Sequence, residues 1–119
     1  MIVSFKELVL LKVIQEYTEK HGQPPTYTEL VVLKTKGGLY NQFLIRNRIR
    51  MFYASKLNSN GGLQKMIDVL RGAGLMEQTT LQLTPEGVGM ELPRFWRDWS
   101  YRINIDNGIP KDSVRLPRV

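Results

Sequence analysis

The sequence predicts a mainly helical fold with one small β-hairpin. Three observations indicate this fold class. Apolar residues recur at helical spacing within residues 5–17 and 63–70, glycine and proline punctuate the chain around these segments, and two short apolar stretches flank a polar turn at residues 78–80. At 119 residues the chain is long enough to bury one modest hydrophobic core.

Residues 4–21 are expected to form the first helix. Ser4 and Glu7 have the spacing of a capping box, in which the hydroxyl accepts the N–H three residues on and the carboxylate reaches back. The apolar face then contains Leu10, Val13, Ile14 and Tyr17, widened by Phe5, Leu8 and Leu11. Gly22 is a natural stop, because a helix C-terminus often needs a left-handed residue, and residues 23–25 (Gln-Pro-Pro) cannot continue the helix.

A second capping box, Thr26 with Glu29, predicts a helix that starts at Tyr27. This helix should end near Lys36, before the glycine pair at 37–38. The sequence therefore predicts two short helices joined by a turn that proline fixes.

Residues 39–57 fit two patterns. At helical spacing Ile45, Ile49 and Phe52 share a face, whereas at period two apolar residues alternate with the arginines at 46, 48 and 50. A helix is favoured because nothing inside the segment turns a hairpin, and a hairpin stays open as the alternative.

Residues 63–70 give the clearest helical pattern of the chain. Its apolar positions follow i, i+3, i+4 and i+7 spacing: Leu63, Met66, Ile67 and Leu70. Gly74 should end this helix, and residues 75–77 and 81–83 are expected to be the two strands of the hairpin. Thr84 and Pro85 then resemble a cap followed by proline at the first helical position, which predicts a short helix running to Leu92.

The expected organisation is a domain over residues 1–92 with an insertion at about 37–58, an aromatic C-terminal segment over 93–107, and an extended basic tail over 108–119. The aromatic segment has three interpretations: a cover for the core, a dimerisation seam, or a surface that stacks on single-stranded bases. Its aromatic residues are Phe95, Trp96, Trp99 and Tyr101.

The net charge of +6 is concentrated in one segment. Residues 34–72 carry a net charge of +7, whereas residues 1–33 carry −1 and residues 73–119 carry none. Such a block creates a local positive potential that suits phosphate groups.

Several functional classes are not supported. With no cysteine, the chain has no disulfide framework, thiolate metal site or cysteine nucleophile, and the one histidine, His21, has a structural explanation at a helix C-terminus. No acid pair, nucleophile–base pattern, P-loop or dinucleotide motif is present, so we expect no enzyme activity, cofactor, metal or small-molecule ligand. The longest apolar stretches contain four residues and no charged-then-apolar leader opens the chain, which favours a soluble cytoplasmic protein without membrane contact.

The order of elements, together with three motifs, resembles a winged helix-turn-helix. Residues 22–30 (GQPPTYTEL) look like the entry to the second helix of LexA-like DNA-binding domains. Residues 63–77 are similar to a recognition helix that runs into the first wing strand, and residues 83–87 (LTPEG) are similar to the motif after the wing in MarR-type and PadR-type regulators. About twenty-five residues, 34–58, separate the second helix from the presumed recognition helix. Residues 39–57 are therefore an alternative candidate for the element that contacts the DNA bases.

The resemblance implies a transcription regulator that binds double-stranded DNA as a homodimer, with its third helix in the major groove. The alternative is a winged-helix module that binds protein partners in a replication or transcription assembly, and a weaker option is single-strand binding through Trp96 and Trp99. Gln64, Lys65 and Asp68 would face outward, although Asp68 repels phosphate and suits a surface role better. The expected DNA-binding residues are Lys34, Lys36, Arg46, Arg48, Arg50, Lys56, Ser59, Asn60, Gln64, Lys65, Arg71, Gln78, Thr79 and Thr80.

Overall fold

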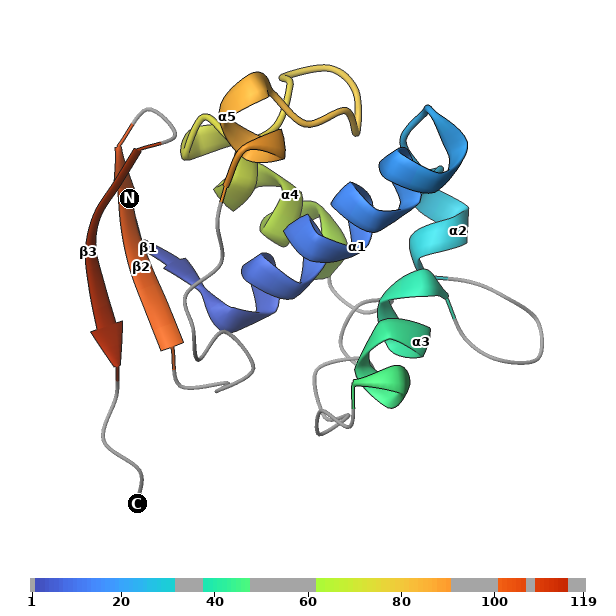
Figure 1. Cartoon of the computed structure of the whole chain (residues 1–119), viewed down its shortest axis with the longest axis horizontal. Coiled ribbons are helices and arrows are strands. Elements are labelled where there is room, and N and C mark those ends of the chain that lie inside the picture. The colour runs from blue at the N-terminus through green and yellow to red at the C-terminus, as the bar shows by residue number, and fades with distance from the viewer. Residues whose placement is uncertain (1, 32–37, 48–61, 91–100, 107–108, 116–119) are drawn as a thin grey trace.

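A computed structural model of the chain shows helices gathered around one long central helix, with a small sheet at one side (Figure 1). The structure describes residues 2–31, 38–47, 62–90, 101–106 and 109–115. The helices are α1 (Phe5–His21), α2 (Tyr27–Val31), α3 (Leu39–Arg46), α4 (Gly62–Gly72) and α5 (Pro85–Val88). The strands are β1 (Ile2–Ser4), β2 (Tyr101–Asp106) and β3 (Ile109–Arg115). The predicted mainly helical character is confirmed.

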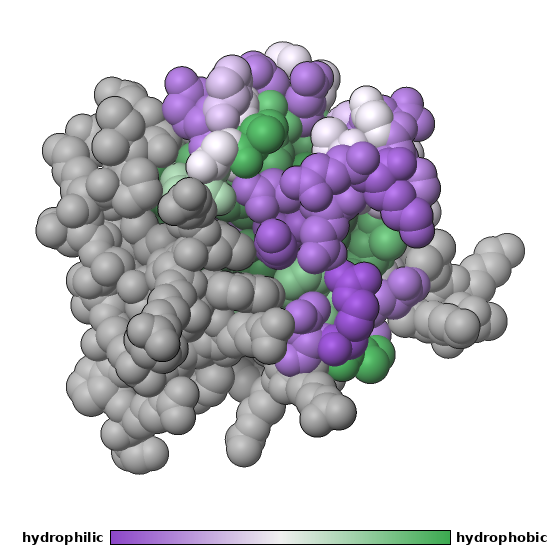
Figure 2. Space-filling view, in the orientation of Figure 1, coloured by the Kyte–Doolittle hydropathy of each residue, from purple (hydrophilic) through white to green (hydrophobic). Residues whose placement is uncertain are grey.

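Helix α1 forms the centre of the core. Its residues 8–11 are fully buried, and it contacts α3, α4 and β1. Contacts with several elements bury more than one side of α1, which explains why its apolar stripe is wider than a surface helix needs. The C-terminal half of α1 is hydrophilic and reaches the surface (Figure 2). Among the described residues, none of the helices combines the length and hydrophobicity that crossing a bilayer would take.

The two ends of α1 differ from each other in how well the sequence predicts them. Gly22 ends the helix as expected: it has a left-handed φ of 74°, and its N–H donates to the Thr18 carbonyl at 2.8 Å. At the other end Ser4 lies at the N-cap, but its hydroxyl donates to the Glu7 carboxylate instead of accepting the Glu7 N–H. The hydroxyl half of the predicted Ser4–Glu7 capping box is therefore wrong. The reason is burial, because a carboxylate that has lost water needs donors around it.

Glu7 is buried, with 4% of its surface exposed, and this gives a prediction for pH dependence. Burial raises the pKa of Glu7 above its ordinary value of 4.5, against the lowering effects of the Ser4 hydroxyl and the Lys6 charge. Because the folded protein holds the Glu7 proton more tightly than the unfolded chain, this group lowers stability as pH rises through and above 4.5. Glu7→Gln is expected to raise the urea midpoint at pH 7 while changing it little at pH 4. The exposed Glu19→Gln on the same helix is the control, and a lower midpoint for Glu7→Gln at pH 7 would contradict the expectation.

Helix α3 decides part of the ambiguity over residues 39–57. Residues 39–46 are helical, so the helix interpretation is confirmed there, and residues 48–57 lie outside the described part of the chain. Tyr40, Phe43 and Leu44 are buried, and α3 contacts both α1 and α2. This part of the expected insertion is therefore a component of the core.

Helix α4 and the chain after it follow the predicted order but not every predicted element. The apolar positions of α4 are buried, and Gly74 with φ 76° follows the helix as expected. The predicted strands at 75–77 and 81–83 are reduced to a single antiparallel bridge, between Met76 and Leu83. Thr84 caps α5 as predicted, accepting the Gly87 N–H at 3.1 Å, with Pro85 at the first helical position.

A three-stranded antiparallel sheet in the order β1-β2-β3 joins the two ends of the chain, which the sequence analysis did not predict. Ile2 pairs with Asn104, and Tyr101 pairs with Arg115. The buried side chain of Ile105 belongs to the hydrophobic core. The extended tail predicted over 108–119 is wrong for residues 109–115, because backbone hydrogen bonds to β2 hold them as a strand.

Candidate nucleic-acid interface

Four of the predicted DNA-binding residues line one surface hollow of about 380 Å³: Gln64, Arg71, Thr79 and Thr80. Two of them come from α4 and two from the loop that follows it. The turn between α1 and α2 forms the opposite wall, a contribution that the sequence analysis missed. Its lining residues are Pro24, Pro25, Thr26 and Tyr27.

The turn is held in place by Glu29. Its carboxylate accepts the Thr26 N–H at 3.0 Å, and the Thr26 hydroxyl accepts the Glu29 N–H at 3.1 Å, so this predicted capping box is confirmed in both directions. Tyr17 of α1 also donates to Glu29, at 2.8 Å. The Thr26 N–H, with Tyr17 as the second donor, lowers the pKa of Glu29. One carboxylate thus fixes the start of α2 and the angle between the first two helices.

The outward face of α4 is polar, as predicted. Gln64, Lys65 and Asp68 are exposed, while the opposite face of the helix is buried. Gln64 Nε2 donates to Asp68 Oδ1 at 2.9 Å. Asp68 therefore has an amide partner one turn away on the same helix.

Arg71 positions the loop after α4. Its Nε donates to the Glu77 carbonyl at 2.7 Å, and its Nη2 donates to the Thr80 carbonyl at 3.0 Å. Gln78 Nε2 donates back to the Arg71 carbonyl at 3.3 Å. Arg71 and Gln78 are therefore used to shape the loop that carries Thr79 and Thr80. A single arginine in the last turn of a helix, followed by a short polar turn, is the only sequence signal for this role.

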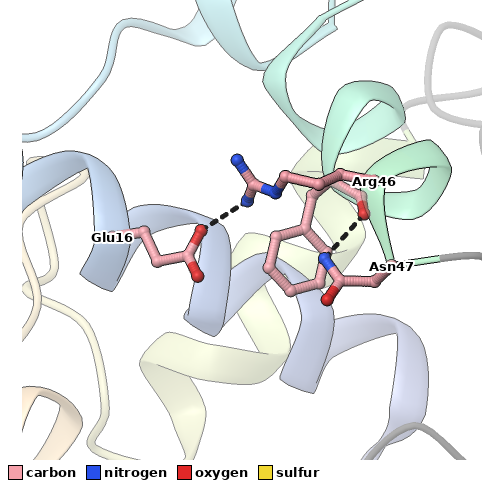
Figure 3. Close-up of polar contacts among 4 residues, drawn as sticks. Glu16, Arg46 and Asn47 are labelled. Atoms are coloured by element: carbon pink, nitrogen blue, oxygen red, sulfur yellow. Dashed lines mark hydrogen bonds and ion pairs between the residues drawn. The ribbon is translucent and has the colours of Figure 1, made fainter.

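Arg46, the last residue of α3, does not line this hollow; its side chain pairs with Glu16 of α1. Its Nη2 is 2.6 Å from Glu16 Oε2, and its guanidinium lies 5.4 Å from the centre of the Phe43 ring (Figure 3). Asn47 ends α3 beside it, with its side-chain amide donating to the Phe43 carbonyl at 2.9 Å. The structure thus gives Arg46 an ion-pair role that the sequence analysis did not foresee.

The remaining predicted residues cannot be placed at this interface. The side chain of Tyr101 is not described, although its backbone lies in β2. The others lie outside the described part of the chain: Lys34, Lys36, Arg48, Arg50, Lys56, Ser59, Asn60, Phe95, Trp96 and Trp99.

Within residues 2–31, 38–47, 62–90, 101–106 and 109–115, no group of three or more acidic, histidine or cysteine side chains is arranged to hold a metal ion. No protein-family model, curated protein or solved structure matches this chain.

Proposed function

We propose that this chain binds double-stranded DNA and regulates transcription, with the outward face of α4 in the major groove and residues 78–81 as a short wing. The observation that carries the proposal is the hollow. Residues of α4 and of the loop after it, which the sequence predicts to contact DNA, line one hollow together with the turn between α1 and α2.

The dimensions of α4 suit a groove-reading helix. Its eleven residues give a length of about 16 Å, and the major groove is about 12 Å wide, which admits one helix. The buried apolar face attaches α4 to the core, so its outward face is presented at a fixed angle.

Two exposed residues of this face, Gln64 and Lys65, have a chemical partner in DNA. The ammonium group of Lys65 suits guanine or a phosphate, and the amide of Gln64 suits adenine. Asp68 holds the Gln64 amide in the free protein, so a base contact by Gln64 exchanges one hydrogen bond for another. Arg71 acts indirectly, by keeping Thr79 and Thr80 at the edge of the hollow.

The charge distribution supports the same proposal from sequence. The block over residues 34–72, with its net charge of +7, includes α4. Phosphate contacts by such a block position a protein on the duplex, while base contacts from a helix specify the sequence.

The test is fluorescence anisotropy with a labelled random-sequence duplex and a single strand of equal length, at several salt concentrations. We expect the duplex to bind more tightly, with an affinity that falls steeply as salt rises. Lys65→Gln is expected to weaken duplex binding and to reduce the salt slope by about one unit.

Lys20→Gln is the matched control, because Lys20 is an exposed lysine of α1 and does not belong to the outward face of α4. Absence of duplex binding at low salt would overturn the proposal and direct attention to an acidic protein partner. Equal losses from Lys20→Gln and Lys65→Gln would remove α4 as the contact element.

A further inference from the structure

Asp68 is an acidic residue on the outward face of α4, beside Gln64 and Lys65. Its side chain is exposed and lies four residues after Gln64 and three after Lys65, so the three are neighbours on the helix surface. A carboxylate weakens binding to every phosphate that it approaches. The presence of an acid on a helix that enters the major groove therefore requires a contact that only an acid can make.

The contact to Gln64 orients the Asp68 carboxylate. Gln64 Nε2 donates to Asp68 Oδ1 at 2.9 Å. Because a carboxylate only accepts hydrogen bonds, this contact also determines which end of the Gln64 amide faces it. The carboxylate offers about four acceptor positions on its two oxygens, and Gln64 occupies one of them. A base contact through Asp68 Oδ2 therefore leaves the bond to Gln64 intact.

The chemistry of the carboxylate favours one base. In the major groove guanine presents the N7 and O6 acceptors, thymine presents an acceptor and a methyl group, and adenine presents an acceptor beside its amino group. Cytosine alone presents a donor, its N4 amino group, without an acceptor. A group that only accepts is complementary to cytosine and is repelled by the acceptors of the other bases. Such repulsion adds specificity.

We propose that Asp68 selects a cytosine in the DNA site by accepting a hydrogen bond from its N4 amino group, while Gln64 holds the carboxylate in place. Lys65 is the complementary neighbour, because an ammonium group only donates and suits the acceptors of guanine. One turn of α4 thus offers an acceptor and a donor to the two bases of a cytosine–guanine pair. The inference rests on the proposed DNA binding, since it assigns a base to a residue of that interface.

The experiment selects bound sequences from a randomised duplex pool with the unaltered chain, with Asp68→Ala, and with Glu77→Ala as the matched control. Glu77 is also an exposed acid, but it belongs to the loop after α4. Because each substitution removes one negative charge, both variants should bind random-sequence duplex more tightly than the unaltered chain. Only Asp68→Ala should lose a cytosine that the unaltered chain and Glu77→Ala both enrich. Asp68→Ala should fold, because the side chain is exposed and alanine favours a helix.

Fluorescence anisotropy on one enriched duplex then tests the atom that is contacted. N4-methylcytosine keeps its pairing with guanine, but it directs a methyl group into the major groove in place of the N–H. Replacing the selected cytosine with N4-methylcytosine is expected to weaken binding by the unaltered chain about tenfold. The same replacement should weaken binding by Asp68→Ala less than about twofold, because the variant has no acceptor to lose.

The outcomes distinguish this inference from the proposed function. If the duplex binds but Asp68→Ala enriches the same sequences as the unaltered chain, the role of Asp68 is overturned and the DNA binding stands. Equal affinities of the unaltered chain for the cytosine and the N4-methylcytosine duplex would overturn it in the same way. Absence of duplex binding at low salt would instead remove the proposed function, and this inference with it.

Discussion

Replacing Gly87 with alanine is expected to destabilise the fold by about 3 kcal/mol. A Cβ at this position would lie 2.0 Å from the Leu75 carbonyl oxygen and 3.0 Å from its carbon. Both atoms belong to the backbone, so no side-chain rotation relieves the overlap. The substitution forces α5 away from the end of α4.

The surroundings of Gly87 make that movement costly. Its carbonyl accepts from Gln15 Nε2 of α1 at 2.8 Å, and its N–H donates to the Thr84 hydroxyl at 3.1 Å. The Leu75 carbonyl in turn accepts the Thr84 N–H at 3.1 Å. Moving α5 breaks a buried hydrogen bond to the central helix, and an unpaired buried group adds its own penalty.

The measurement is urea unfolding followed by circular dichroism, with Gly89→Ala as the matched control. Gly89 lies two residues away, is exposed, and has a φ of −82° that alanine adopts without strain. Its nearest contact for a Cβ is the Pro85 carbonyl oxygen, at 3.3 Å. We expect Gly89→Ala to cost less than about 1 kcal/mol. If Gly87→Ala cost no more than the control, α5 would not lie against Leu75.

Comparison of the two capping boxes indicates what local sequence can predict. Thr26 and Glu29 form the predicted reciprocal box because both lie in one turn at the surface, and the Glu29 oxygen that accepts the Thr26 N–H is not the one that accepts from Tyr17. Ser4 and Glu7 have the same spacing, but the buried Glu7 carboxylate accepts from the Ser4 hydroxyl. Spacing predicts the pairing of the residues, and burial decides which atom donates.

The candidate interface was predictable in part for the same reason. Helical periodicity identified the outward residues of α4, since the apolar positions determine which face is buried. The wall formed by Pro24–Tyr27 and the loop-shaping role of Arg71 depend on elements that meet only in the folded chain. Residue pattern within one element carries no information on such contacts.

The sheet is the clearest case of a feature that periodicity does not reveal. β1 has only three residues, too few for an alternating pattern, and its partner β2 lies near the other end of the chain. Composition favours an extended tail over 108–119, although an Asn-Gly dipeptide such as that at residues 107–108 is a common connection between paired strands. Pairing between strands so far apart in sequence depends on the burial of residues such as Ile105 in the shared core.

Tyr40→Ala is expected to cost about 3–5 kcal/mol of stability, whereas Tyr40→Phe should cost only about 1 kcal/mol. Tyr40 is fully buried in α3, where its ring packs in the core that α3 shares with α1 and α2. Removing the ring therefore leaves a cavity at the junction of three helices. Its hydroxyl donates to the Lys6 carbonyl of α1 at 2.9 Å. Phenylalanine keeps the ring but loses this bond, and the Lys6 carbonyl, which lies inside a helix, still accepts the helix's own N–H.

Urea unfolding of both variants distinguishes the contribution of the ring from that of the hydroxyl. If the two substitutions destabilised the protein equally, the hydrogen bond to Lys6 would be the main connection between α3 and α1. If Tyr40→Ala cost less than about 1 kcal/mol, the ring would not be buried and α3 would not belong to the core. A large difference between the variants would place the anchor of α3 in the apolar contact of the Tyr40 ring.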